Sequence, residues 1–166
     1  MKEDQHRHLR RLGRVWVESP VYFMTACTDQ RRRILANTAV ANILIGDWRA
    51  AEERHGWVVG RYVIMPDHVH FFCAAEHNAK TLSEFVRLWK QWTMKGMKAA
   101  EPRLASAATA AGTTTARVWQ REFFDHVLRS EESYAEKWEY VRQNPVRAGL
   151  VARAEDWAFQ GEIHSL

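Results

Sequence analysis

Cysteine is scarce in this sequence, and long apolar runs are missing. The two cysteines, Cys27 and Cys73, each stand in a short apolar stretch and have no second cysteine close by. A disulfide scaffold needs more cysteines and a zinc knuckle needs paired spacing, so we expect two small buried side chains instead. No stretch approaches the ~20 consecutive apolar residues of a membrane helix. These absences favour a soluble, globular protein without a membrane partner.

Residues 1–19 are rich in arginine and histidine but lack the apolar centre of a signal peptide. We interpret them as a basic, loosely structured arm and expect a cytoplasmic, nucleoid-associated bacterial protein. The chain has 166 residues, with neither an internal repeat nor a linker. This length suits a single domain over residues 1–166 that is able to bury a real core.

Positive charge is modest in total but clustered. The net charge is +4 at pH 7, and arginines and lysines gather at 7–14, 31–33 and 87–98. The sequence also has eight tryptophans, most of which we expect in the core. Basic residues beside aromatic ones are what a protein needs to bind single-stranded nucleic acid through phosphate contacts and base stacking.

The order of apolar patterns predicts the fold class. Short β-branched and aromatic runs predict strands at 21–28, 57–65 and 68–75 and one or two more within 118–128, whereas helical spacing, with Asn37, Thr81 and Ser130 as N-caps and Gly56 and Pro145 as stops, predicts three helices. Residues 99–117 are expected to form an Ala/Thr-rich loop or frayed helix end, and residues 146–166 to pack over the sheet or be partly disordered. The order β-α-β-β-α-β-α indicates an α+β, ferredoxin-like sandwich with an antiparallel sheet.

The second predicted helix should have one apolar and one basic face. At ~100° per residue, the two sets of side chains separate around the helix. We expect Leu82, Phe85, Trp89 and Trp92 to face the core, and Arg87, Lys90, Lys95 and Lys98 to face solvent.

The sequence His68-Val69-His70 is the first candidate for chemistry. Alternate residues of a strand share a face, so two imidazoles at i and i+2 can bind one metal ion, with Asp67 as a further ligand or an orienting group. Taken alone, this pattern more often describes two ordinary strand histidines. However, the pair interrupts an apolar run, where ring nitrogens need partners, and a metal ion would supply one.

Tyr140 and Asn144 form the second candidate. A spacing of i, i+4 places them one turn apart on the flank of the third helix, whose core stripe is Tyr134, Trp138 and Val141. In isolation, Tyr140 reads as a surface aromatic and Asn144 as a helix end before Pro145. Joined with the histidines, they fit a tyrosine that attacks a phosphodiester and forms a covalent link to phosphate. Two imidazoles and an amide oxygen suit Mg²⁺ or Mn²⁺ better than structural zinc.

Several blocks of the sequence resemble one known family. YVIMPDHVHFF is similar to the histidine–hydrophobic–histidine (HUH) segment of IS200-like single-tyrosine transposases. WQREFFDHVLRSEE and YVRQNPVRAGLV resemble later blocks of the REP-associated tyrosine transposases, and the resemblance extends over residues 15–155. It implies an HUH endonuclease architecture and an enzyme that nicks and rejoins single-stranded DNA beside a short hairpin.

The resemblance also implies residue roles. It makes His68 and His70 metal ligands, Tyr140 the nucleophile that forms a 5′-phosphotyrosine link, and Asn144 the third ligand. Two neighbours fit less well: the competing Tyr134 is followed four residues later by Trp138, which cannot bind metal, and Gln143 lies on the wrong helical face. His126 matches a family block and is given only a supporting role.

The expected partner is hairpin or single-stranded DNA of REP type. We expect phosphate contacts, with salt-sensitive affinity, from a set of basic side chains: Arg31, Arg32, Arg33, Arg87, Lys90, Lys95 and Lys98. Both a monomer and a homodimer remain open. So do two other functions: a DNA- or RNA-binding regulator that has lost its chemistry, and an unrelated metal hydrolase that uses His68, His70 and Asp67.

Overall fold

One antiparallel sheet with helices on both faces forms the fold. The computed structural model describes residues 20–102 and 117–166. The strands are β1 (Val21–Cys27), β2 (Trp57–Ile64), β3 (His68–Ala75), β4 (Phe124–Leu128) and β5 (Gln160–Glu162); the helices are α1 (Thr38–Arg49), α2 (Ala51–His55), α3 (Leu82–Ala100), α5 (Glu131–Arg142) and α6 (Asn144–Arg147). The strand order is β4-β1-β3-β2-β5, and every neighbouring pair is antiparallel.

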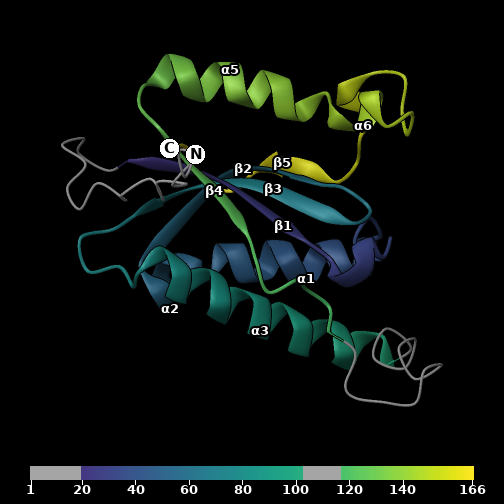
Figure 1. Ribbon diagram of the computed structural model, residues 1–166, viewed down its shortest axis with the longest axis horizontal. Helices are drawn as coiled ribbons and strands as arrows, with labels where there is room; N and C mark the ends of the chain where they lie inside the picture. The colour runs from purple at the N-terminus through teal and green to yellow at the C-terminus, as the bar shows by residue number, and fades with distance from the viewer. Residues whose placement is uncertain (1–19, 103–116) are drawn as a thin grey trace, which may run out of the picture.

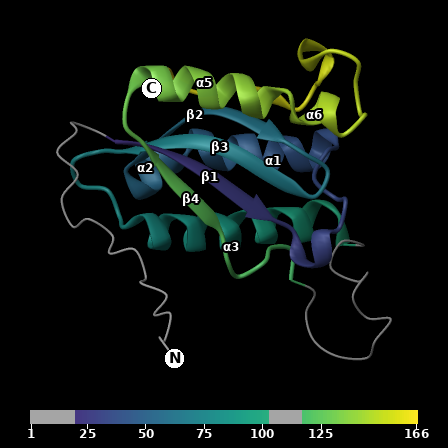
Figure 2. The same ribbon diagram turned by 45° about the horizontal axis from the view of Figure 1, so that its top comes forward.

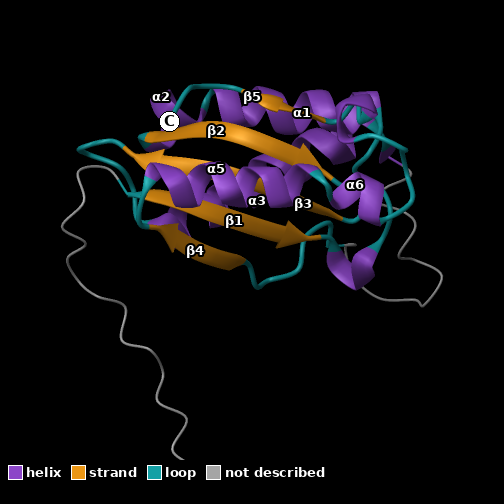
Figure 3. Ribbon diagram, turned by 90° about the horizontal axis from the view of Figure 1, so that it is seen from above, coloured by secondary structure: helices purple, strands orange, loops and turns teal. Residues whose placement is uncertain are grey.

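The helices form two layers around the sheet. Helices α1, α2 and α3 cover one face, and α5 crosses the other face (Figure 1). Turning the molecule shows that α5 runs over the central strands, with α6 beyond its end (Figures 2 and 3). The first four strands and the α1–α3 layer are the expected ferredoxin-like α+β sandwich, so this prediction is confirmed, and α5 is an addition on the open face.

Local signals in the sequence set the helix ends. The side chains of Asn37, Thr81 and Ser130 each accept a hydrogen bond from a backbone N–H in the first turn of the following helix. Gly56 ends α2 in the left-handed conformation, with φ of 72°, which glycine adopts without steric cost. These four boundaries are therefore confirmed, but the single helix predicted between Asn37 and Gly56 is broken at Ala50 into α1 and α2.

The central strand β3 divides its side chains between two cores. Val69, Phe71 and Cys73 are fully buried and belong to the large cluster under α1 and α3. Phe72 belongs to a smaller cluster under α5 and packs its ring 4.7 Å from that of Tyr134. His68 and His70 share the face of Phe72 because strand side chains alternate. Both histidines therefore face α5.

Trp92 is exposed, so its predicted core position is wrong. The buried residues of α3 are Phe85, Val86, Trp89, Thr93 and Met97. This buried stripe drifts around the long helix and leaves Trp92 at its edge, with 45% of its surface exposed. The Trp92 ring lies 5.0 Å from the guanidinium carbon of Arg54 and 5.7 Å from the ammonium of Lys95, where its face attracts both cations.

The C-terminal segment packs against the sheet. The third predicted helix ends at Arg142, and α6 then begins at Asn144 with Pro145 in its first turn, where its missing N–H costs nothing. Strand β5 pairs with β2. Residues 1–19 and 103–116, which include most of the Ala/Thr-rich stretch, lie outside the described residues. Among the described helices, none is long and apolar enough to span a membrane.

The double-sided packing of β3 predicts different effects for two adjacent truncations. Phe71→Ala and Phe72→Ala should each destabilise the fold by about 3–5 kcal/mol, because both rings are fully buried. Only Phe72→Ala removes the surface on which α5 packs, so amide hydrogen exchange should accelerate in α5 relative to α1 and α3. The reverse pattern is expected for Phe71→Ala. Equal acceleration in both layers of the Phe72→Ala variant would contradict separate packing of α5.

Candidate functional site

A pocket of about 460 Å³ opens between β3 and the α5–α6 helices. It brings together the four candidates for chemistry, His68, His70, Tyr140 and Asn144. The rest of its lining is Phe23, Met65, Lys137, Val141, Arg147 and Ala148. The predicted nucleophile and the predicted metal ligands therefore share one cavity, although they come from a strand and from two helices far away in the sequence.

His68 is oriented by its neighbour in sequence, Asp67. The Nδ1 atom of His68 donates a hydrogen bond of 2.7 Å to Oδ1 of Asp67, since a carboxylate can only accept. The other carboxylate oxygen of Asp67 lies 2.9 Å from Nε of Arg31. With the proton on Nδ1, the Nε2 atom of His68 carries a lone pair that is available to a ligand.

His70 is oriented by Thr25, its direct partner on the neighbouring strand β1. The Thr25 hydroxyl and Nδ1 of His70 share a hydrogen bond of 2.8 Å. When this nitrogen carries the proton, Nε2 of His70 also presents a lone pair. The two imidazole rings lie 4.8 Å apart between centroids and nearly perpendicular to each other. Histidines that bind metals commonly have their second nitrogen fixed in this way.

Both imidazoles are held in the neutral form. Burial lowers the pKa of His68, and the hydrogen bond and charge of Asp67 offset only part of this effect. Burial also lowers the pKa of His70, and the charges of His68, Lys137, Arg31 and Arg147 add to it, so that the pKa falls to about 3. Neutral imidazole is the form that binds a metal ion, so the site keeps its donors ready at neutral pH.

Tyr140 presents its ring at the mouth of the pocket. The side chain is 62% exposed. The guanidinium carbon of Arg147 lies 4.2 Å from the ring centroid, and the ammonium of Lys137 lies 5.7 Å from it. Two cations thus flank a phenol that a large substrate can reach. Such charges favour both a bound phosphate and the negative charge that develops on the phenolic oxygen.

Asn144 is fixed by Arg147 at the start of α6. Arg147 Nη2 donates to the side-chain oxygen of Asn144 and, over 2.6 Å, to the backbone oxygen of Tyr140. An amide oxygen has two lone pairs, so Asn144 can accept from Arg147 and still bind a cation. Neither Gln143 nor Tyr134 lines the pocket: Gln143 donates to Glu139, and Tyr134 packs on Phe72.

The donors available to a metal ion are two imidazoles and one amide. Within residues 20–102 and 117–166, no cluster of three or more His, Cys, Asp or Glu side chains could hold a metal ion. Any ion bound in this pocket therefore needs the Asn144 oxygen, a substrate phosphate or water beside His68 and His70. That donor set fits Mg²⁺ or Mn²⁺, which retain water and bind phosphate oxygens.

The three arginines of the 31–33 run have different environments. Arg31 contacts Asp67 and also donates to Sγ of Cys27 at 2.7 Å, so it belongs to the support of His68. Arg32 donates to the backbone oxygen of Arg117. Arg33 is exposed. Of these three arginines, it alone forms no side-chain hydrogen bond or ion pair with the described residues. Arg31 and Arg32 therefore bind groups within the protein, which their sequence as a basic run does not suggest.

The basic residues of α3 are also divided. The Lys90 ammonium donates to the backbone oxygens of Gln120, Arg121 and Glu122, and burial lowers its pKa to about 8. All three of its donors are therefore used inside the fold. Arg87 and Lys95 are exposed and Lys98 half-buried. These three side chains remain candidates for phosphate contact.

Sequence reasoning missed three groups around the site: Thr25, Lys137 and Arg147. The pairing of Thr25 with His70 depends on strand register between segments far apart in the sequence. Lys137 and Arg147, however, stand three residues before Tyr140 and three residues after Asn144. Helical spacing of i, i+3 could have found both.

Comparison with known proteins identifies the family. A family model described as "Transposase IS200 like" matches residues 17–144, which include both histidines and Tyr140. The chain belongs to the IS200-like transposase family. A REP-associated tyrosine transposase of Escherichia coli K12 is 23% identical over 148 residues, which cover 88% of this chain and 78% of that protein. A relative from Haemophilus influenzae Rd is 22% identical over 154 residues, with 88% and 81% covered.

Solved structures share the fold. A REP-associated tyrosine transposase bound to a REP hairpin has a TM-score of 0.65 and 21% identity, covering 89% of this chain and 79% of that one. A crystal structure from Deinococcus radiodurans R1 has a TM-score of 0.57 and 24% identity, covering 79% and 95%. The family assignment, together with these folds, places the chain among transposases of the α+β type.

The low pKa of His70 predicts how stability depends on pH. An unfolded histidine titrates near 6.5, whereas folded His70 titrates near 3, so between these values only the unfolded chain is protonated there. The free energy of unfolding therefore falls as pH drops from about 6.5 towards 3. His70→Gln should lose less stability over this range, by on the order of 3 kcal/mol at about pH 4.

Urea unfolding in the presence of EDTA, at neutral and acidic pH, measures this difference. The control is His126→Gln, which removes an exposed histidine of β4. This variant should follow the wild-type pH dependence. If His70→Gln also followed it, His70 would not be held neutral in the folded state.

Proposed function

We propose that this transposase cleaves and rejoins single-stranded DNA beside a hairpin, through a covalent 5′-phosphotyrosine intermediate and with a divalent metal ion. The observation that carries the proposal is the shared pocket: an exposed phenol with two flanking cations faces two neutral, pre-oriented imidazoles. A relative of this fold whose structure is bound to a REP hairpin supports hairpin DNA as the partner.

The proposed step uses Tyr140 as the nucleophile. Its phenolic oxygen bonds to phosphorus, the bond from phosphorus to the 3′ oxygen breaks, and the released 3′ oxygen takes up a proton while the phenol loses one. The phosphate stays on the 5′ strand, linked to Tyr140. Attack by another 3′-hydroxyl reverses the step and rejoins DNA, so the energy of the phosphodiester bond is kept. Neither water nor a high-energy cofactor is consumed.

The side chains around Tyr140 prepare this step. Arg147 stacks on the ring and ties α6 to the last turn of α5, which limits the positions of the phenol. Lys137 lies 4.7 Å from the ring of Phe23 and 5.7 Å from that of Tyr140, where its charge attracts the DNA backbone. His68, His70 and Asn144 would hold Mg²⁺ or Mn²⁺. When bound, that ion polarises the phosphate and stabilises its developing charge.

Exposed aromatic side chains favour a single-stranded substrate. Phe124, on the edge strand β4, pairs with Thr25 and therefore lies on the same sheet face as His70. It is 61% exposed, close to the value for Tyr140. Flat apolar rings in solvent give unpaired bases a surface for stacking, which paired bases inside a duplex cannot use.

Replacement of the nucleophile tests the proposal most directly. Wild-type protein, labelled hairpin DNA from sequence beside its own gene, and Mn²⁺ or Mg²⁺ should give a covalent protein–DNA species on a denaturing gel. Tyr140→Phe removes only the attacking oxygen, so the adduct should disappear while hairpin binding stays within about twofold. The matched control is Tyr134→Phe, since Tyr134 lies on the same helix outside the pocket. It should form the adduct.

The outcomes separate the competing functions. An adduct that persists in Tyr140→Phe would transfer the role of nucleophile to another residue. DNA cleavage without any adduct in either protein would point to a hydrolase that uses water. Hairpin binding without cleavage by the wild type would favour a regulator with the same fold.

The orientation of His70 by Thr25 predicts a separate effect on metal affinity. Thr25→Val keeps the side-chain shape but removes the hydroxyl, so we expect the affinity for Mn²⁺ to fall about 10–100-fold with little change in stability. Isothermal titration with Mn²⁺ measures it. Thr38→Val, which makes the same change on the exposed first turn of α1, should bind like wild type. Unchanged affinity in Thr25→Val would argue against His70 as a ligand.

A further inference from the structure

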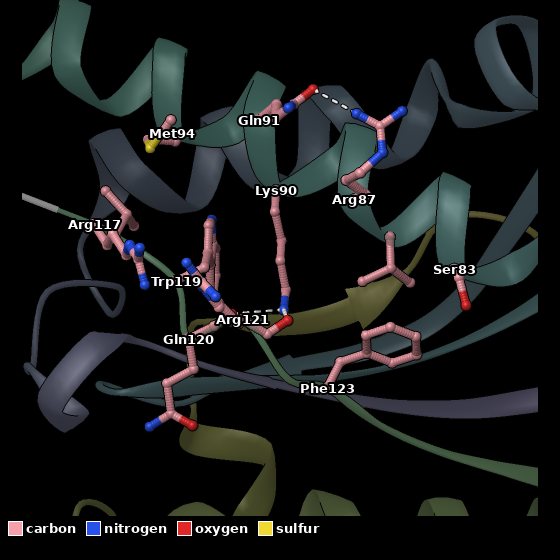
Figure 4. Close-up of a pocket in the computed structure, with 12 residues that line it drawn as sticks. Ser83, Arg87, Lys90, Gln91, Met94, Arg117, Trp119, Gln120, Arg121 and Phe123 are labelled. Carbon is pink, nitrogen blue, oxygen red and sulfur yellow. Dashed lines mark hydrogen bonds between the residues drawn. The ribbon is translucent and has the colours of Figure 1, made fainter.

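A second pocket lies on the α3 side of the sheet, away from Tyr140. It has a volume of about 490 Å³ and opens between α3 and residues 117–123, which lead into β4 (Figure 4). This volume falls within the range of about 300–1,000 Å³ that is usual for small-molecule sites. It shares no lining residue with the pocket of Tyr140.

The inner surface of this pocket is apolar. Val86 and Met94 of α3 line one side, and Trp119 and Phe123 of the 117–123 segment line the other. The Trp119 indole is fixed because its Nε1 donates over 2.9 Å to the hydroxyl of Thr93, a buried residue of α3. The pocket therefore offers aromatic and aliphatic surface in a defined arrangement, as a planar apolar ligand requires.

Lys90 holds the two walls together. From α3 it crosses to the opposite wall and donates to the backbone oxygens of Gln120, Arg121 and Glu122 (Figure 4). Its ammonium lies 5.5 Å from the ring of Phe123. These bonds fix the backbone of residues 120–122 against α3. The shape of the site therefore depends on Lys90, whose donors are all occupied.

The rim of the pocket is positively charged. Arg87, Arg117 and Arg121 line it and are exposed, and no lining residue is an aspartate or glutamate. Arg87 donates only to the neutral amide of Gln91, at 3.3 Å. Within residues 20–102 and 117–166, none of the three arginines forms an ion pair. A ligand that combines a flat apolar part with negative charge matches this pocket.

This pocket and the pocket of Tyr140 both lie near the Cys27 end of β1. The backbone N–H of Gln120 donates to the carbonyl of Cys27, and Cys27 is the direct partner of His68 across the sheet. Trp119 forms a β-bridge with Thr28, the next residue. The two pockets therefore lie on opposite faces of the sheet, near the same end of β1. Beside β1, β4 is the outermost strand of the sheet, so a DNA strand could pass from one pocket to the other around β4.

We propose that this pocket is a second nucleotide-binding site, which takes an unpaired nucleotide of single-stranded DNA with its base against Phe123 and its phosphates on Arg87, Arg117 and Arg121. The proposal rests on the proposed function in so far as DNA is the substrate. It adds a site on the other face of the sheet that anchors the strand away from the cleavage point. Stacking and phosphate contact together are the usual means of binding single strands.

Binding measurements in EDTA, where cleavage does not interfere, test this site. The probes are a fluorescent oligothymidylate strand and a fluorescent blunt-ended DNA duplex. Arg121→Gln should weaken oligothymidylate binding and reduce the salt slope by about 0.7, the value for one phosphate contact on a single strand. Phe123→Leu keeps much of the packing but loses the ring, and should weaken binding by roughly fivefold or more. Neither change should alter duplex binding.

Matched controls separate this site from general electrostatics. Arg49→Gln removes the same charge from the exposed end of α1, outside both pockets. It should bind oligothymidylate like wild type. As a second measurement, a strand that carries 5-iododeoxyuridine should crosslink under ultraviolet light to the peptide containing Trp119 and Phe123.

The results distinguish this proposal from the proposed function. If Arg121→Gln and Phe123→Leu bind oligothymidylate like wild type and the crosslink maps elsewhere, the pocket is not a nucleotide site, even where the Tyr140 adduct forms. If the pocket variants lose binding while wild type forms no adduct with hairpin DNA and Mn²⁺, the nucleotide site stands and the proposed chemistry fails. Equal losses in Arg49→Gln would also overturn the site, since they would show only non-specific attraction.

Discussion

The packing of Phe72 against α5 is the contact on which the candidate active site depends. Phe72 is fully buried and lies against Tyr134 and Trp138, which attach the helix to the centre of the sheet. Since β3 alternates its side chains, His70 faces the same helix two residues earlier, under its later turns. One apolar contact thereby sets the distance between the strand that carries the imidazoles and the helix that carries Tyr140.

The electrostatics of the Tyr140 pocket depend on this packing of α5 over β3. Burial makes protonation of His70 unfavourable, and the nearby cations Lys137 and Arg147 strengthen that effect. The same cations would stabilise a phosphate placed in the pocket. In the proposed function, positive charge therefore serves two purposes, because it keeps the imidazoles neutral and would attract the phosphates of the substrate. Asp67 supplies negative charge beside His68 and Arg31. Burial tends to raise the pKa of Asp67, but the hydrogen bond and charge of His68 and the charge of Arg31 lower it overall.

Much of the fold was predictable because it depends on local patterns. Caps at Asn37, Thr81 and Ser130, and alternation along β3, are short-range signals, and they gave the three helix starts and the shared face of the histidines. The break between α1 and α2, the helix α6 that contains Pro145, and the strand β5 were not predicted. The exposed position of Trp92 was not predictable from a simple helical wheel, since the buried stripe of α3 drifts over its length. Hydrogen bonds across the sheet, such as that from His70 to Thr25, depend on register and were missed for that reason.

Charge was the feature least visible in the sequence. Arg31 and Lys90 stand in basic runs and look like contacts for DNA, yet one supports Asp67 and the other ties α3 to the 120–122 backbone. A cation whose donors are already bound adds little to phosphate affinity, because binding DNA would first break those bonds. In the proposed function, the number of phosphates neutralised would therefore be smaller than the basic runs suggest. The slope of affinity against salt should reflect the exposed arginines and lysines rather than all of them.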